Sequence, residues 1–198
     1  MKAVMMSIKP KYVADILNGE KTIEVRKKFP KDYVGWVYIY VTKDENKKLY
    51  FSTFHGKYMV AKYVDHKHKI LNGKVVARFW CDKVEEIKRK GCDIYTDTMY
   101  ESALLDKSCL YLDEFCHYFK HDEWQEKEIV VGKAIHITKL EIFDKPKEIK
   151  EFRKPNTFSL EQLREFGLPY NEEMYKDMAT KGKWFLTRAP ESWCYIEV

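Results

Sequence analysis

Three charged side chains of mixed sign, Lys21, Glu24 and Arg26, lie within six consecutive residues. The β-branched residues among them favour an extended backbone. Because side chains alternate between the two faces of a strand, Thr22, Glu24 and Arg26 are expected to share one face. Lys21 has the opposite parity, but its long stem allows the ammonium to bend toward that face. The segment therefore predicts a polar pocket or, alternatively, a solvent-facing strand edge with surface ion pairs.

The chemistry of this cluster is that of ligand capture. A lysine and an arginine held by a glutamate can donate hydrogen bonds to phosphate or carbonyl oxygens. Glu24 can accept from the amino group of a base, as carboxylates do from cytosine. We expect binding rather than covalent chemistry, because an ordinary charged lysine is a donor and not a base. If a reaction occurs, Glu24 would activate a water while Lys21 and Arg26 stabilise an oxyanion.

A strand and a short helix precede the cluster and must position it. Residues 3–8 predict the strand, and Pro10 suits the first turn of the helix. Gly19 is expected to end this helix in the left-handed conformation. Ser7 and Lys9, on alternate positions before Pro10, are candidates to line the same pocket, or else form an ordinary strand surface.

The rest of the chain also mixes strands and helices. Apolar runs and period-two alternation predict strands at residues 36–42, 74–81, 134–143 and 193–198. Helical spacing predicts helices at residues 98–105, 112–119 and 159–166, the last with a capping box. Residues 49–64 suggest a hairpin around His55 and Gly56, and residues 82–90 either a short helix or a strand extension. Strands at both ends predict that the termini meet in one sheet. The fold class is therefore α+β, a small, strongly curved mixed-topology barrel with helices at its rim.

Composition bounds the class of protein. The chain has 198 residues, 45% of them hydrophobic, enough for one domain with a sizeable core. A net charge of +5 permits nucleic-acid contact without requiring it. Five cysteines without a C-x-x-C spacing are expected to be reduced thiols in a cytoplasmic protein. We expect neither a signal peptide nor a membrane span, because no long apolar run occurs.

Residues 19–26 resemble the ASCH family, a branch of the PUA-like superfamily, whose signature G-x-K-x-x-E-x-R is matched at all four positions. The predicted first strand and helix, the strands at 36–42 and 74–80, and the segment 189–193 also resemble that family. The resemblance covers the first forty residues well and the rest loosely. Residues 43–72 and 88–130 look like insertions in a single domain spanning 1–198.

The resemblance implies a PUA-like pseudo-barrel with a cleft whose floor carries the signature charges. It also implies binding of RNA or a modified nucleoside, in a regulatory role or otherwise, without a cofactor. Some ASCH proteins hydrolyse the amide of acetylated cytidine, and others have been credited with ribonuclease action. In the amidohydrolases a lysine at the position of Lys21 assists a threonine three residues on. This chain has Glu24 there, with Thr22 displaced by two residues along the same face.

Seven residues are predicted to bind the ligand. They lie at the pocket mouth, in the signature segment 19–26 or near the end of the chain: Ser7, Lys9, Lys21, Thr22, Glu24, Arg26 and Trp193. If the protein is an enzyme, Lys21, Glu24 and Arg26 are the catalytic candidates. Trp193 shares strand parity with Tyr195 and would either stack on a base or pack in the core.

Two other classes of function remain open. An RNA-directed hydrolase would use the same cluster, whereas a protein-interaction module would use helices within residues 97–120. Cys116, His117 and His121 have a spacing compatible with a metal, but a solvated helix flank is the favoured interpretation and no metal is predicted. The histidines of the lysine-rich tract at 65–69 are expected to be solvated, or at most to contact phosphate.

Overall fold

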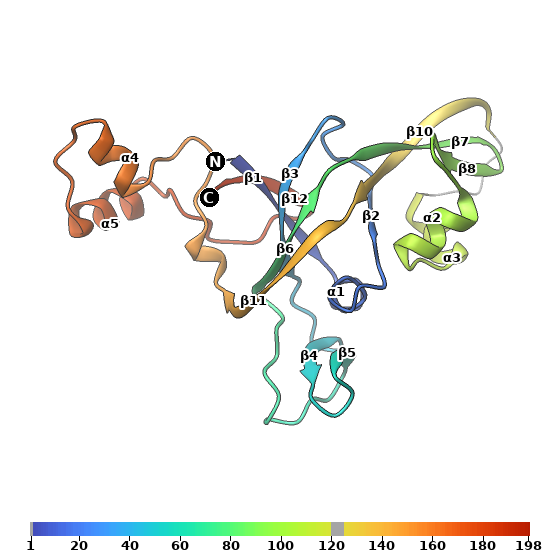
Figure 1. Cartoon of the computed structure of the whole chain (residues 1–198), viewed down its shortest axis with the longest axis horizontal. Coiled ribbons are helices and arrows are strands. Elements are labelled where there is room, and N and C mark those ends of the chain that lie inside the picture. Colours follow the sequence, from blue (N-terminus) through green and yellow to red (C-terminus); the bar gives the residue numbers. More distant parts are fainter. Residues whose placement is uncertain (1, 120–124) are drawn as a thin grey trace.

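The computed structural model describes residues 2–119 and 125–198 and has a mixed α+β fold (Figure 1). The strands of its two larger sheets are β1 (Lys2–Ile8), β2 (Ile23–Arg26), β3 (Gly35–Val41), β6 (Val75–Cys81), β7 (Val84–Gly91), β8 (Asp93–Thr96), β9 (Met99–Tyr100), β10 (Gln125–His136), β11 (Thr138–Lys147) and β12 (Trp193–Glu197). A separate hairpin consists of β4 (Lys48–Ser52) and β5 (Lys57–Ala61). The helices are α1 (Pro10–Leu17), α2 (Glu101–Ser108), α3 (Leu112–Phe119), a 3-10 turn η1 (Ile149–Glu151), α4 (Leu160–Glu165) and α5 (Glu172–Lys181).

Two long antiparallel segments join the two larger sheets. One sheet has the order β11-β6-β3-β1-β12 and the other the order β2-β10-β7-β8-β9. The chain passes from the first to the second between β6 and β7, and returns between β10 and β11. The resulting surface curls into a half-barrel, which confirms the predicted α+β class. The termini meet as predicted, because β1 pairs with β12.

Alternation along the central strands builds two cores on opposite faces of the first sheet. Val4, Met6 and Ile8 of β1 pack toward α1, whereas Ala3 and Met5 pack toward the C-terminal segment. Each buried side chain of this size contributes roughly 1.5–3 kcal/mol. Strand β1 is thus fixed from both sides, and with it the position of the residues at its end.

The structure corrects several sequence predictions. The strand predicted at 134–143 is broken at Ile137, where the chain crosses between sheets and the Ile137 amide donates to Thr22 O at 2.9 Å. The helix predicted at 98–105 begins only at Glu101, after the short strand β9. Residues 84–91 form a separate strand, β7, which belongs to the second sheet, so 82–90 is neither a helix nor a continuation of β6. Helix α5 was not predicted, because it is largely polar and buries only Ala179.

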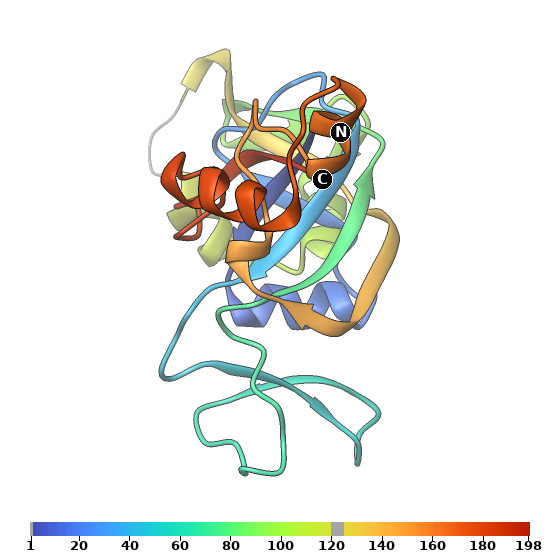
Figure 2. The ribbon, with the colours of Figure 1, turned by 90° about the vertical axis from the view of Figure 1, so that its left-hand side faces the viewer.

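The segment 43–72, called the arm below, projects away from both larger sheets (Figures 1 and 2). Its base is tied by Asn72, which accepts from the Leu49 amide at 2.8 Å and donates to Thr42 O and Lys47 O. Asn18, after α1, makes two 2.9 Å hydrogen bonds with the backbone of Tyr58. These bonds hold the predicted hairpin against α1. In the part of the chain described, no helix is long and apolar enough to cross a membrane.

Candidate functional site

Glu24 lies at the centre of a buried charge network. Its Oε1 lies 2.9 Å from Arg26 Nε, and its Oε2 lies 3.4 Å from Lys21 Nζ. Ile23 and Val25 face the core beneath α2 and α3, so the predicted parity of β2 holds and the even-numbered side chains share the other face. Because Glu24 is only 5% exposed, the charges are gathered rather than splayed into solvent.

Lys21 is satisfied by the end of a distant helix. Its Nζ donates to Ser108 O, the last residue of α2, at 2.5 Å, and lies 5.3 Å from the centre of the Tyr12 ring. A helix C-terminus carries partial negative charge, which favours a cation there. Lys21 is 2% exposed and lines the cavity, so it forms part of the buried floor.

Arg26 ties β2 to the end of β1 and the approach to β12. Its Nη2 donates to Ser7 O at 2.6 Å and its Nη1 to Ser192 Oγ at 3.4 Å. Nε is close to Glu24 but has no well-aligned hydrogen bond, so that contact is an ion pair by proximity. Ser7 Oγ in turn donates to Pro190 O at 2.7 Å. These contacts fix the guanidinium plane before any ligand arrives.

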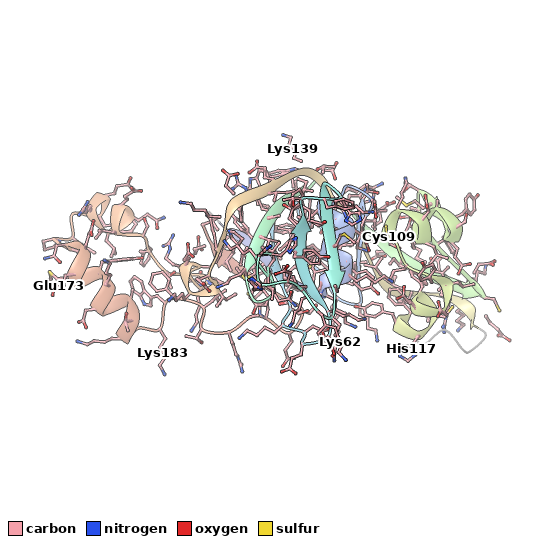
Figure 3. The ribbon with its side chains drawn as sticks, turned by 90° about the horizontal axis from the view of Figure 1, so that it is seen from below. Lys62, Cys109, His117, Lys139, Glu173 and Lys183 are labelled. Carbon is pink, nitrogen blue, oxygen red and sulfur yellow. The ribbon has the colours of Figure 1, made fainter. Side chains whose placement is uncertain are left out.

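The network forms the floor of a cavity of about 360 Å³. Tyr12, Leu110 and Tyr118 supply much of its apolar wall, from α1, α3 and the loop between α2 and α3. His117 of α3 also lines the cavity, and lies on the side of the molecule that carries α2 and α3 (Figure 3). The volume lies within the usual range of small-molecule sites, about 300–1,000 Å³.

The formal charges lining this cavity balance. Its cations are Lys9, Lys21 and Arg26, and its anions are Glu24, Glu114 and Glu191. The site is therefore not a well of positive potential for a polyanion. It offers donors and acceptors side by side, an arrangement that suits a neutral ligand carrying both.

Tyr12 is kept as a protonated donor. Burial, together with the nearby carboxylates of Glu114 and Glu24, raises its pKa to about 12. Glu114 is itself held by Lys11, whose Nζ lies 3.0 Å from Oε1. This pair bridges α1 and α3 across the pocket wall.

The structure brings together five of the seven predicted ligand-binding residues: Ser7, Lys9, Lys21, Glu24 and Arg26. Thr22 is exposed and lies outside the lining, because it precedes the first ladder residue of β2 and the alternation does not yet apply. Trp193 is also outside the lining. It packs edge-on against Phe29 and donates to Lys28 O at 2.8 Å.

Sequence reasoning missed the contributions of Tyr12, Glu114 and Tyr118. The periodicity of α1 and α3 identified their buried faces, but no local signal showed that α3 covers the charged strand. His121, in the proposed metal spacing, lies outside the described residues. Within residues 2–119 and 125–198, no group of three or more His, Cys, Asp or Glu side chains is placed to hold a metal ion.

Comparison with known proteins gives a likeness of shape only. No protein-family model and no curated protein matches the chain. The crystal structure of an ASCH protein from Zymomonas mobilis matches with 12% identity and a TM-score of 0.42, over 98% of this chain and 87% of that one. A point variant of that protein matches with 11% identity and a TM-score of 0.46 over the same shares. TM-scores below 0.5 are too low to carry a functional assignment.

Proposed function

We propose that this chain is a single ASCH-type domain, with insertions at 43–72 and 88–130, whose cavity binds the base of a nucleoside, free or within RNA. The observation that carries the proposal is the convergence of Lys21, Glu24 and Arg26 at the floor of a charge-balanced cavity. The complete four-residue signature in the sequence supports the family. We also propose a cytoplasmic location, supported by the cysteine usage.

The network keeps hydrogen-bonding capacity for a ligand. A lysine ammonium has three donors and a guanidinium has five. Hydrogen bonds among the described residues engage one donor of Lys21 and two of Arg26, while their contacts with Glu24 are ion pairs. The Glu24 carboxylate has about four acceptor positions and serves two cations. Donors and acceptors therefore remain beside each other on the floor, already oriented.

This arrangement favours a base that presents an amino group beside a carbonyl. Glu24 would accept from the amino group, as carboxylates do from cytosine N4. A remaining N–H of Arg26 or Lys21 would donate to the carbonyl oxygen. Cytosine and guanine offer both groups, whereas uracil lacks the amino group and adenine lacks the carbonyl. Tyr12 and Tyr118 on the wall supply faces for the apolar body of the base.

The hydrolase alternative places Glu24 as the base that activates water. Two cations hold its carboxylate, which favours a role in binding over proton abstraction. A threonine mechanism has less support, because Thr22 lies outside the cavity. The preference for binding over catalysis therefore rests on geometry.

Isothermal titration with cytidine, N4-acetylcytidine, guanosine, uridine and adenosine tests the proposal. Cytidine or guanosine is expected to bind at least tenfold tighter than uridine or adenosine, since one well-placed polar pair is worth about 1–3 kcal/mol. Glu24→Gln should remove this preference, whereas Glu161→Gln, on the distant helix α4, is the matched control. Chromatography of the same mixtures detects product. Turnover of N4-acetylcytidine lost in Glu24→Gln would favour the hydrolase, and equal affinity in both variants would remove Glu24 from any ligand role.

A further inference from the structure

The arm holds most of the net charge of the protein. Residues 43–72 contain seven lysines against three acidic residues, which gives +4 of the total of +5. Three of the six histidines, His55, His66 and His68, also lie there. A single thirty-residue segment therefore carries nearly all of the cationic excess. Such a surface attracts polyanions.

Aromatic side chains are interleaved with these lysines. Phe51, Phe54 and Tyr63 are 43%, 90% and 82% exposed. Exposed aromatic rings cost free energy in water unless something covers them, and a surface combining them with lysines matches the chemistry of unstacked bases linked by phosphates. Duplexes hide the faces of their bases, so the arm favours single strands.

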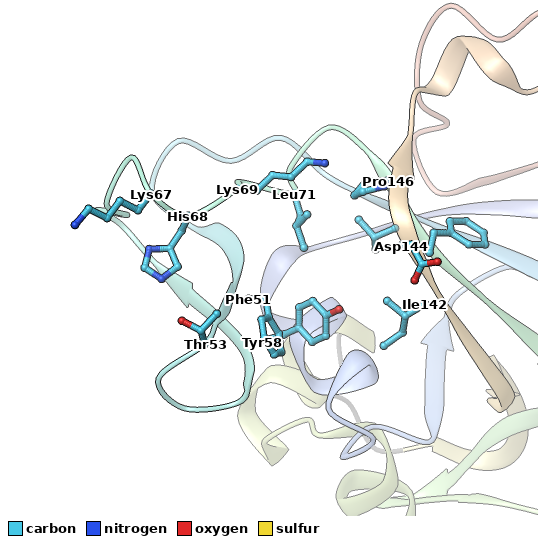
Figure 4. Close-up of a pocket in the computed structure, with 12 residues that line it drawn as sticks. Phe51, Thr53, Tyr58, Lys67, His68, Lys69, Leu71, Ile142, Asp144 and Pro146 are labelled. Carbon is cyan, nitrogen blue, oxygen red and sulfur yellow. The ribbon is translucent and has the colours of Figure 1, made fainter.

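A cavity of about 600 Å³ lies between the arm and β11 (Figure 4). Phe51 and Tyr58 line it from the hairpin, and Ile142 and Pro146 line it from β11. Lys69 extends toward β11, whereas Lys67 lies on the outer side of the same loop with its ammonium directed away from β11 (Figure 4). The cavity thus combines an apolar interior with a cationic margin.

Asp144 lies on the β11 wall, opposite the lysines (Figure 4). A carboxylate there repels phosphate but accepts hydrogen bonds from the amino groups of bases. The division of charge therefore orients a strand, with its phosphates toward Lys67 and Lys69 and its bases toward Asp144 and Phe51.

We propose that the cavity between the arm and β11 is a second site, which binds single-stranded nucleic acid by stacking bases on Phe51 and holding phosphates with Lys67 and Lys69. The site goes beyond the nucleoside cavity and does not depend on it. The two are separate surfaces, since their linings share no residue. An acidic protein segment is the competing occupant of such a surface.

Fluorescence anisotropy with a labelled twelve-nucleotide single-stranded RNA tests the site in the full-length protein, over a range of salt concentrations. The double variant Lys67→Gln/Lys69→Gln should weaken binding about tenfold near 0.1 M salt, and lower the magnitude of the slope of log affinity against log salt by roughly 1.4, or about 0.7 for each lost phosphate contact. Its matched control is Lys57→Gln/Lys62→Gln, which removes the same charge from the arm outside the cavity. The control should retain most of the affinity.

Three outcomes would overturn the second site: equal losses in the two double variants, equal binding of an RNA duplex, or displacement of the RNA by polyglutamate of matched charge. Nucleoside titrations of the same variants separate the two proposals. Lys67→Gln/Lys69→Gln should leave cytidine binding unchanged, and Glu24→Gln should leave the salt slope of RNA binding unchanged. Failure of one proposal is then visible without failure of the other.

Discussion

The cavity floored by Lys21, Glu24 and Arg26, which is the proposed nucleoside cavity, differs from the arm in its use of charge. In the cavity, cations and anions balance, and Lys21 and Glu24 are nearly sealed from water within a network of short contacts. On the arm, lysines outnumber acidic residues seven to three, and Lys67 and Lys69 are exposed. The first arrangement orients single atoms of a ligand, whereas the second attracts a charged chain over a distance.

This difference predicts different sensitivity to salt. Charges buried in a pocket are screened little, whereas exposed charges are screened beyond about 10 Å at 0.1 M salt. Nucleoside binding should therefore be nearly independent of salt, and RNA binding through the arm strongly dependent on it.

The largest expected effect is on stability. Lys21→Met leaves Glu24 with one cation and Ser108 O without its donor, and should cost about 3 kcal/mol of unfolding free energy. Lys67→Met, the same change at an exposed position, should stay within about 0.5 kcal/mol of wild type. Urea denaturation monitored by tryptophan fluorescence measures both. Similar values for the two variants would show that Lys21 is not buried in a network.

A smaller effect is expected from removing one ring of the arm. Phe51→Ala should weaken binding of single-stranded RNA by about 1–3 kcal/mol, the usual contribution of a stacked base. Phe54→Ala removes a more exposed ring that lies outside the cavity lining, and should cost much less. Anisotropy titrations compare the two. A larger loss for Phe54→Ala would move the contact to the tip of the hairpin.

The pH dependence of stability should include a contribution from Tyr12, beside those of other groups whose pKa burial raises, such as Cys81 and Tyr58. Because the pKa of Tyr12 is raised from 10.0 to about 12, the unfolded chain loses that proton first as pH rises. The folded state then binds more protons, so stability should fall between about pH 10 and pH 12. Tyr12→Phe should make this decline less steep, while the contribution of groups such as Cys81 remains. The absorbance of tyrosinate gives an independent check, and ionisation of Tyr12 near pH 10 would contradict the burial.

The smallest effect is expected at Thr22. Its side chain is exposed and outside the cavity, so Thr22→Ala should leave nucleoside affinity within a factor of two, on the order of 0.4 kcal/mol. The same titrations used for Glu24→Gln measure it. A large loss would restore a threonine mechanism to consideration.

The features that could be predicted from the sequence are those that depend on residues close together in the chain. The alternation of β2, the positive φ of 78° at Gly19 and the hairpin around His55 and Gly56 follow from neighbouring residues, and the structure has all three. The Ser159 capping box is likewise present. These features need no knowledge of the distant chain.

The rest depends on the path of the chain through space. Ser108 meets Lys21 from 87 positions away, and Glu114 meets Lys11 from 103 positions away. No local pattern in either segment indicates its partner. The contacts arise only because the chain crosses between the two sheets at β6 and β7, which brings α2 and α3 close to β2 and α1. Thr22 failed to join the cavity for a smaller reason, since β2 begins one residue later than the alternation assumed.

The most direct measurement is a titration of the methyl-labelled protein with cytidine, followed by nuclear magnetic resonance. Ile8 and Val25 line the nucleoside cavity, and Ile142 lines the cavity beside the arm. We predict saturable chemical-shift changes at Ile8 and Val25 and none at Ile142. The cytidine concentration at half saturation should be the same at about 0.05 M and about 0.3 M salt, which bracket the concentration at which the Debye length is about 10 Å. Shifts at Ile142 alone, or no shifts at any of the three, would contradict the proposal that the charge-balanced cavity binds the base.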